Sequence, residues 1–218
     1  GGGGAAGAGA YVCPLGGVLN CSSTGALKLA SGQVTDFSSL QWNSTTEQWC
    51  DADGLRGRIF SFAGPGSAAS TVSVDTTAQN LRLDVMAKDW GGGGLVFESC
   101  VNASSYTSVQ FKVSLASGSL SGCTWQVQLQ TQDQRASTND DPTGGTCASN
   151  CYRYPVVANL AVPSASGTVY TEPFTAFTNQ VTSAIPTASQ VVGIQWQVNA
   201  STSSGCTAQL RIDNVRFQ

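Results

Sequence analysis

The chain has 218 residues, a formal net charge of −3 and only 11% charged residues, with no histidine. This length fits one all-β domain. The small negative charge argues against a nucleic acid or an anionic membrane surface as partner, because either would require a basic patch. The sequence has no run of 18 apolar residues, so it predicts no membrane-spanning helix.

Residues 1–10 contain only Gly and Ala and are predicted to be a flexible linker. A linker in this position suggests a monomeric module that is tethered to other domains of a longer chain. Residues 11–218 are predicted to form a single β-sandwich module. Within it, residues 11–33 are a leading segment that is pinned by a disulfide.

Eight cysteines occur. Their even number favours disulfide bonds in an oxidising compartment, and therefore a secreted protein. The sequence leaves the pairing open, although short loops favour Cys147–Cys151 and Cys13–Cys21. Half of a zinc site is the alternative for Cys147 and Cys151, but no second Cys or His pair stands at ligand spacing. Sequons, which matter only if the source glycosylates, begin at Asn20, Asn43, Asn102 and Asn199.

From residue 34 onward, short segments of alternating apolar and polar residues are separated by turns rich in Gly, Ser and Pro. Residues 89–94 are predicted to be a loop, and residues 133–155 form one long loop, which at this length is usually functional. The chain is thus predicted to be all-β, a two-sheet antiparallel β-sandwich (jelly roll) with disulfides. The segments predicted as strands lie at residues 59–62, 71–74, 81–85, 95–98, 108–113, 123–132, 156–162, 168–170, 194–199 and 208–217.

Residues 123–133 alternate strictly. Trp125, Val127 and Leu129 fall on one face of an extended chain, which is predicted to be the core face. The other face carries amides, whose paired donors and acceptors suit sugar hydroxyls, although a solvated sheet face is the alternative. A second strand at residues 194–199 repeats this design. The outward amides of the two strands are Gln126, Gln128, Gln130, Gln132, Gln195, Gln197 and Asn199.

Aromatic side chains in loops or at strand ends could stack on a sugar ring, and arginines could reach its oxygens. Trp42 and Arg135 belong to this wider set of candidates. For Tyr152 and Tyr154, the alternative is that their rings only pack against a disulfide. The residues predicted to contact the ligand are Gln126, Gln128, Gln130, Gln195, Gln197, Tyr152, Tyr154, Arg153, Trp90 and Arg82.

Several short motifs follow one another between residues 34 and 218. They are Asp36-Phe37 followed by Trp42 or Trp49, Gly91–Phe97, Tyr106–Phe111, Gly144–Cys147 with Cys151, Gly193–Trp196, and Ile212–Phe217. This ordered set resembles the jelly-roll carbohydrate-binding modules of the galactose-binding-like type, nearest to family 11 and the related modules of secreted glycanases. The resemblance implies non-catalytic binding of a neutral polysaccharide, above all a β-glucan such as cellulose. The low charge of the amide face argues against pectin or alginate.

The same resemblance implies one structural calcium ion between the first and last strands, away from the sugar. Its expected ligands are Asp36 and Asp213, because calcium binds hard oxygen donors. The alternative is that Asp213 only interrupts the last strand and that Asp36 is a solvated turn residue. A second candidate, residues 51–54, has the Asp-x-Asp-Gly pattern but lacks the full calcium-loop signature.

Catalysis is the rival class of function. Without histidine the chain cannot build a Ser-His-Asp triad or a Cys-His dyad. A glycoside hydrolase needs two carboxyl groups, for which Glu98 with an aspartate such as Asp84 is the available pair. A lyase that uses Tyr152, Arg153 and Tyr154 stays open, as does a lectin-like adhesion or surface-layer domain.

Overall fold

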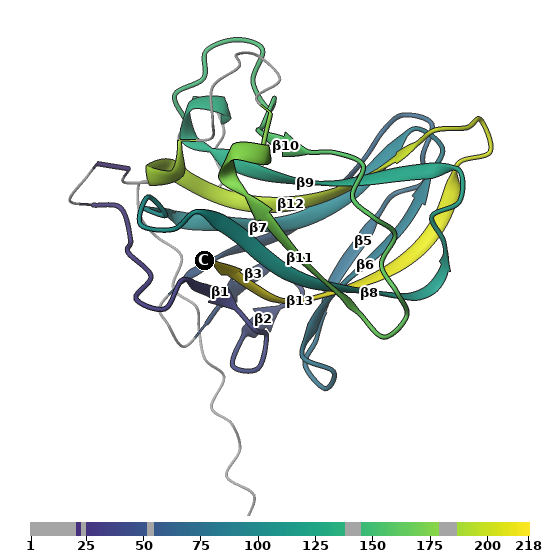
Figure 1. The fold of residues 1–218 in the computed structure, drawn as a ribbon, viewed down its shortest axis with the longest axis horizontal. Helices are drawn as coiled ribbons and strands as arrows, with labels where there is room; N and C mark the ends of the chain where they lie inside the picture. Colours follow the sequence, from purple (N-terminus) through teal and green to yellow (C-terminus); the bar gives the residue numbers. More distant parts are fainter. Residues whose placement is uncertain (1–20, 23–24, 52–54, 138–144, 179–186) are drawn as a thin grey trace, which may run out of the picture.

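The computed structural model describes residues 21–22, 25–51, 55–137, 145–178 and 187–218. Over these residues the protein is a sandwich of two antiparallel sheets with three short 3₁₀ helices, η1 (Gln132–Gln134), η2 (Phe174–Ala176) and η3 (Ala188–Gln190) (Figure 1). The predicted fold class is confirmed. The predicted linker and most of the leading segment lie outside the described residues.

The two sheets have different strand orders. The seven-stranded sheet has the order β10 (Val156–Val157), β9 (Cys123–Thr131), β12 (Val191–Ala200), β7 (Trp90–Val101), β4 (Arg56–Ala63), β3 (Gln48–Cys50) and β2 (Gln41–Asn43). The six-stranded sheet has the order β11 (Thr168–Pro173), β8 (Ser108–Ser119), β13 (Cys206–Phe217), β6 (Asn80–Ala87) and β5 (Thr71–Asp75), and β1 (Gln33–Thr35) pairs with β13.

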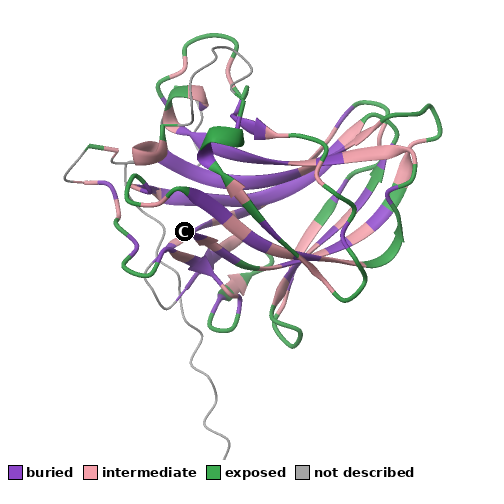
Figure 2. Ribbon diagram, viewed as in Figure 1, coloured by how far each residue is buried: buried purple, intermediate pink, exposed green. Residues whose placement is uncertain are grey.

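The core lies between the two sheets, where alternate residues of each strand meet. Trp125 and Trp196 are at most 1% exposed, which confirms that the apolar sides of both amide-bearing strands face inward. Phe111 of β8 packs edge-on against both indole rings, at centroid distances of 6.4 and 5.7 Å. Figure 2 shows this continuous buried layer along β7, β9 and β12. The amide sides of β9 and β12 must therefore point away from the second sheet.

The tetraglycine stretch Gly91–Gly94 is part of β7, so the predicted loop at residues 89–94 is wrong. On the inner face, a Cβ atom added at Gly93 would stand 2.3 Å from Cγ2 of Val72 in the other sheet. On the outer face, a Cβ atom added at Gly92 would stand 2.7 Å from Cζ of Phe62. These glycines therefore mark close approach on both faces of a strand and not a turn.

Three disulfides are described. Cys147–Cys151 confirms one predicted pair, whereas Cys21 pairs with Cys100, so the predicted Cys13–Cys21 pair is wrong. The reason is that the leading segment runs beside the end of β7, where Leu27 N–H donates to the Cys100 carbonyl at 2.7 Å. The third pair, Cys123–Cys206, joins β9 to β13 across the sandwich. Cys50 is also disulfide-bonded, and Cys13 lies outside the described residues.

No helix within the described part of the chain is long and apolar enough to cross a membrane.

Candidate functional site

A groove of about 870 Å³ lies on the outer face of the seven-stranded sheet. Residues of β9 and β12 form one side, and residues of β4 and β7 form the other. The loop that follows η1 contributes to one end. The described lining residues are Phe60, Phe62, Trp90, Val96, Gln126, Gln128, Gln130, Arg135, Tyr152, Tyr154, Gln195, Gln197 and Asn199.

Six amide side chains on β9 and β12 form one continuous hydrogen-bonded row, because Gln195 lies opposite Gln128 and Gln197 lies opposite Gln126 in the strand register. Gln130 Nε2 donates to Gln195 Oε1 at 2.6 Å, and Gln195 Nε2 donates to Gln128 Oε1 at 2.5 Å. In the same direction, Gln128 Nε2 donates to Gln197 Oε1 at 3.5 Å and Gln197 Nε2 donates to Asn199 Oδ1 at 2.6 Å. Asn199 Nδ2 then donates to Gln126 Oε1 at 3.1 Å. This amide chain runs through Gln130, Gln195, Gln128, Gln197, Asn199 and Gln126.

The amide chain leaves part of each amide available. A primary amide has two N–H donors and two acceptor lone pairs, and each interior member donates one bond and accepts one within the chain. Each interior amide therefore retains one further N–H and one further lone pair. Gln128 and Gln130 are only 4% exposed and Gln195 is 8% exposed, so they form the deep part of the groove floor. Gln126 and Gln197 are half-buried and form its more open end.

Three aromatic rings form the opposite wall. Phe60 and Phe62 alternate with the buried Ile59 on β4, so both rings lie on the outer face. The Phe60 and Phe62 centroids are 5.9 Å apart, and the Phe62 and Trp90 centroids are 5.8 Å apart. Trp90 is a predicted ligand residue, whereas the two phenylalanines were missed. Their alternation with Ile59 was the signal, since it places two rings opposite the core face.

The tyrosine end of the groove is shaped by the disulfide loop. Cys147 N–H donates to the Arg135 carbonyl at 3.0 Å, and Tyr152 N–H donates to the Gln134 carbonyl at 2.7 Å. Tyr152 is 53% exposed, whereas Tyr154 is 4% exposed, and their rings meet edge-on at 6.3 Å. Burial raises the pKa of the Tyr154 hydroxyl, against a smaller lowering by the nearby Arg135 guanidinium. The ring of Tyr152 is therefore accessible to solvent, and the buried ring of Tyr154 packs against it.

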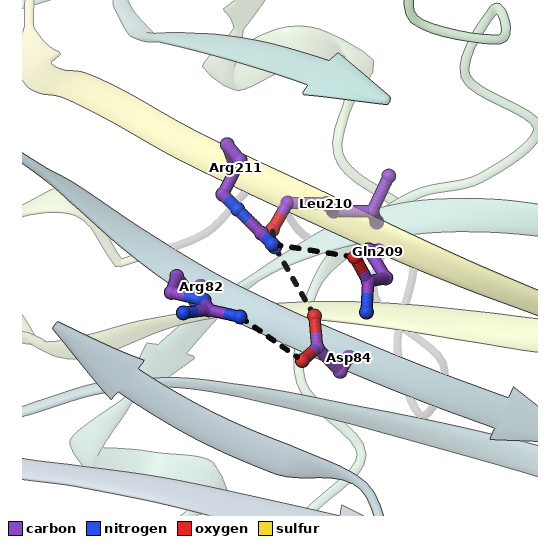
Figure 3. A network of polar contacts seen from close by, with 5 residues as sticks. All are labelled: Arg82, Asp84, Gln209, Leu210 and Arg211. Carbon is purple, nitrogen blue, oxygen red and sulfur yellow. Dashed lines mark hydrogen bonds and ion pairs between the residues drawn. The ribbon is translucent and has the colours of Figure 1, made fainter. Parts of the chain in front are cut away.

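Two predicted ligand residues are not brought to the groove. Arg153 is exposed and does not line it. Arg82 lies on β6 of the other sheet, with Nη2 3.9 Å from Asp84 Oδ2, and Asp84 Oδ1 accepts a bond from Arg211 at 3.1 Å (Figure 3). Strand alternation predicts that Arg82 points away from the core, but it does not predict on which sheet.

Asp36 and Asp213 lie close enough for their charges to interact. Burial raises the pKa of Asp213, and the Asp36 charge adds to this effect against the lowering by Asn214 and Lys112. Hydrogen bonds from Ser38 lower the pKa of Asp36. Carboxylate oxygens are among the ligands that calcium prefers, and those of Asp36 and Asp213 accept hydrogen bonds from Ser38 and Asn214. Within the described ranges no group of three or more Asp, Glu, Cys or His could hold a metal, so the other donors would be carbonyl or hydroxyl oxygens.

The second calcium candidate starts at Asp51, whose carboxylate is occupied by hydroxyl groups. Thr35 Oγ1 and Ser39 Oγ each donate to it at 2.6 Å. Residues 52–54, which complete that candidate, lie outside the described residues. In the described part, Asp51 ties the turn after β1 to the end of β3.

The carboxyl pair considered for glycoside hydrolysis is not assembled. Glu98 on β7 is 3% exposed, and its Oε2 is 2.5 Å from Arg56 Nε. Asp84 lies on β6 of the other sheet and interacts with Arg211 there. The two carboxyl groups therefore belong to separate ion pairs on separate sheets and cannot flank one glycosidic bond.

No protein-family model matches the chain, and no curated protein matches its sequence. Among solved structures, the family 11 carbohydrate-binding module of a cellulosomal cellulase from Clostridium thermocellum is similar, with a TM-score of 0.54 and 10% identity over 87% of this chain and 94% of that one. A family 11 module from Clostridium thermocellum in complex with a β-1,3-1,4-mixed-linked tetrasaccharide has a TM-score of 0.50 and 10% identity over 73% of this chain and 87% of that one. At this identity the likeness shows the fold, which is a jelly roll like that of the family 11 carbohydrate-binding modules, as the motifs predicted.

Proposed function

We propose that this protein is a non-catalytic carbohydrate-binding module that holds a neutral polysaccharide, a β-glucan, in the groove. The amide chain is the observation that carries this proposal. Each interior amide keeps one donor and one acceptor, which matches a hydroxyl group, since a hydroxyl both donates and accepts. A carboxylate or sulfate group only accepts, so it would leave the amide acceptors without partners.

The aromatic wall supports the same class of ligand. Phe60, Phe62 and Trp90 present apolar ring faces, on which the apolar face of a pyranose can stack while its hydroxyls meet polar groups. None of the described lining residues carries a carboxylate. The mixed-linked β-glucan tetrasaccharide bound to the family 11 module of Clostridium thermocellum makes a β-glucan the first ligand to test.

The candidate catalytic groups support a non-catalytic role. Glu98 is buried in an ion pair. A tyrosine base in a lyase needs a hydroxyl that ionises readily, whereas burial raises the pKa of Tyr154. Disulfides persist in oxidising compartments, which supports a secreted module, and we propose that it acts as a monomer tethered to other domains of its parent protein. One structural calcium ion held by Asp36 and Asp213 completes this proposal.

Affinity electrophoresis against soluble polysaccharides tests the function. Mixed-linkage β-glucan should retard the protein, whereas pectin and alginate should not. The double variant Gln126→Ala/Gln197→Ala removes the open end of the amide chain and should weaken binding by roughly tenfold or more. Gln209→Ala, an amide variant on β13 of the other sheet, is the matched control and should bind normally. Retardation by no neutral glycan, or equal binding by both variants, would refute the proposal.

A further inference from the structure

A second, smaller cavity of about 110 Å³ adjoins the wall of the groove. Phe60 is a lining residue of both cavities. The small cavity lies where the turn between β2 and β3 meets β4, with Val72 of the other sheet on its inner side. Its described lining residues are Trp42, Ser44, Glu47, Ile59, Phe60, Ser61 and Val72.

The small cavity includes an open edge of the seven-stranded sheet. The pairing of β3 with β4 runs only as far as Gln48 opposite Arg58. Ile59 N–H points to this edge, since it donates to the Glu47 carbonyl at 2.8 Å. Backbone groups alternate in direction along an antiparallel strand, so the N–H and C=O of Ser61 point to the same edge, beyond the end of β3. The cavity therefore offers a backbone donor and acceptor.

Side chains add further polar groups. The indole Nε1 of Trp42 is buried and has no hydrogen-bond partner within the described structure, which is unfavourable unless something else accepts its proton. Glu47 is exposed and has a φ of 59°, a conformation that a Gly or Asn would adopt more readily. Its presence at this position suggests a role for the carboxylate itself.

We propose that the small cavity binds a single-sugar branch of a glycan whose backbone lies in the groove. The proposal rests on the proposed function and adds a preference for branched over unbranched neutral polysaccharides. The indole N–H and the Glu47 carboxylate supply a donor and an acceptor for hydroxyl groups, and the indole ring supplies apolar surface. One water molecule needs about 10–15 Å³ of such space, so the cavity has room for a larger group than water but not for a second glycan chain.

Calorimetric titration with two oligosaccharide series tests this branch site. One series has an unbranched β-1,4-glucan backbone, and the other has the same backbone with single-sugar side chains. The protein should bind the branched series roughly tenfold more tightly. Glu47→Gln and Trp42→Phe should each reduce this preference while leaving affinity for the unbranched series unchanged. Glu172→Gln on β11, which lines neither cavity, is the control and should keep the preference.

The outcomes separate the branch site from the groove. Equal affinity for both series, or an unchanged preference in Glu47→Gln, would overturn the branch site and leave the groove proposal standing. Loss of both series in Gln126→Ala/Gln197→Ala would support the groove. Binding of neither series would overturn both proposals. If Trp42→Phe fails to fold, the Glu47→Gln result alone tests the branch site. Glu47 is a surface residue, and circular dichroism can verify that the Glu47→Gln variant is folded.

Discussion

Replacing Gln195 is the most demanding test of the amide chain, because this side chain makes two of the short hydrogen bonds in the chain. Its Oε1 accepts from Gln130 at 2.6 Å, and its Nε2 donates to Gln128 at 2.5 Å. Gln195→Ala removes both bonds, each of which contributes about 1 kcal/mol, and leaves two buried amides with unmet partners. We therefore expect a loss of about 2–4 kcal/mol in the free energy of unfolding. Gln126→Ala, at the end of the chain, removes one bond of 3.1 Å and should cost about 1 kcal/mol or less.

Urea unfolding followed by the fluorescence of the buried tryptophans measures both losses. Each variant should shift the midpoint without changing the slope, since neither alters the surface that unfolding exposes. The double variant Gln128→Ala/Gln195→Ala should lose less than the sum of the single variants, because both single variants break the same bond. Equal stability of Gln195→Ala and Gln126→Ala, or strict additivity in the double variant, would refute the continuous amide chain and leave the outer face as ordinary solvated surface.

Two further predictions concern the metal and the disulfides. Burial raises the pKa of Asp213 in the folded state above the ordinary carboxyl value of 3.8. The folded protein should therefore lose stability as the pH rises above 3.8 and Asp213 ionises. In the presence of chelator, Asp213→Asn should raise the melting temperature at neutral pH but not in acid. Calcium should raise the melting temperature of the wild type but not of Asp213→Asn, and equal melting curves with and without chelator would count against the site. Serine replacement of the Cys123–Cys206 pair, separated by 83 residues, should cost about 4–5 kcal/mol, but only about 2 kcal/mol for Cys147–Cys151. In calorimetry only the Cys147–Cys151 replacement should weaken glycan binding, since that loop positions Tyr152, and unchanged affinity would argue against this role.

The faces of individual strands could be predicted from the sequence because side-chain alternation is a local property of the extended chain. Trp125 and Trp196 face the core, and the glutamines beside them line the groove for this reason. The assignment of strands to sheets is not local. Arg82 therefore points away from the core as predicted, but it lies on the six-stranded sheet, whereas the groove lies on the seven-stranded sheet.

The remaining failures also have non-local causes. Gly91–Gly94 looks like a turn in isolation, and its role in close packing depends on Val72 and Phe62 from other strands. The Cys21–Cys100 disulfide depends on the leading segment lying beside β7, although a short loop favoured Cys13 as the partner of Cys21. Composition and periodicity carry no information on either contact.

The amide chain also explains why glutamine suits this groove, although flexible side chains usually weaken binding. Ordering a free side chain of this kind costs about 0.5–1.5 kcal/mol on association. Gln195 and Gln128 are already fixed by their neighbours and buried, so this cost is met when the protein folds. Every bond of the chain runs in one direction, and reversing it would require all six amides to turn together. The groove thus presents its donors and acceptors in a fixed order, and a glycan, whose two ends differ, is expected to bind in one orientation.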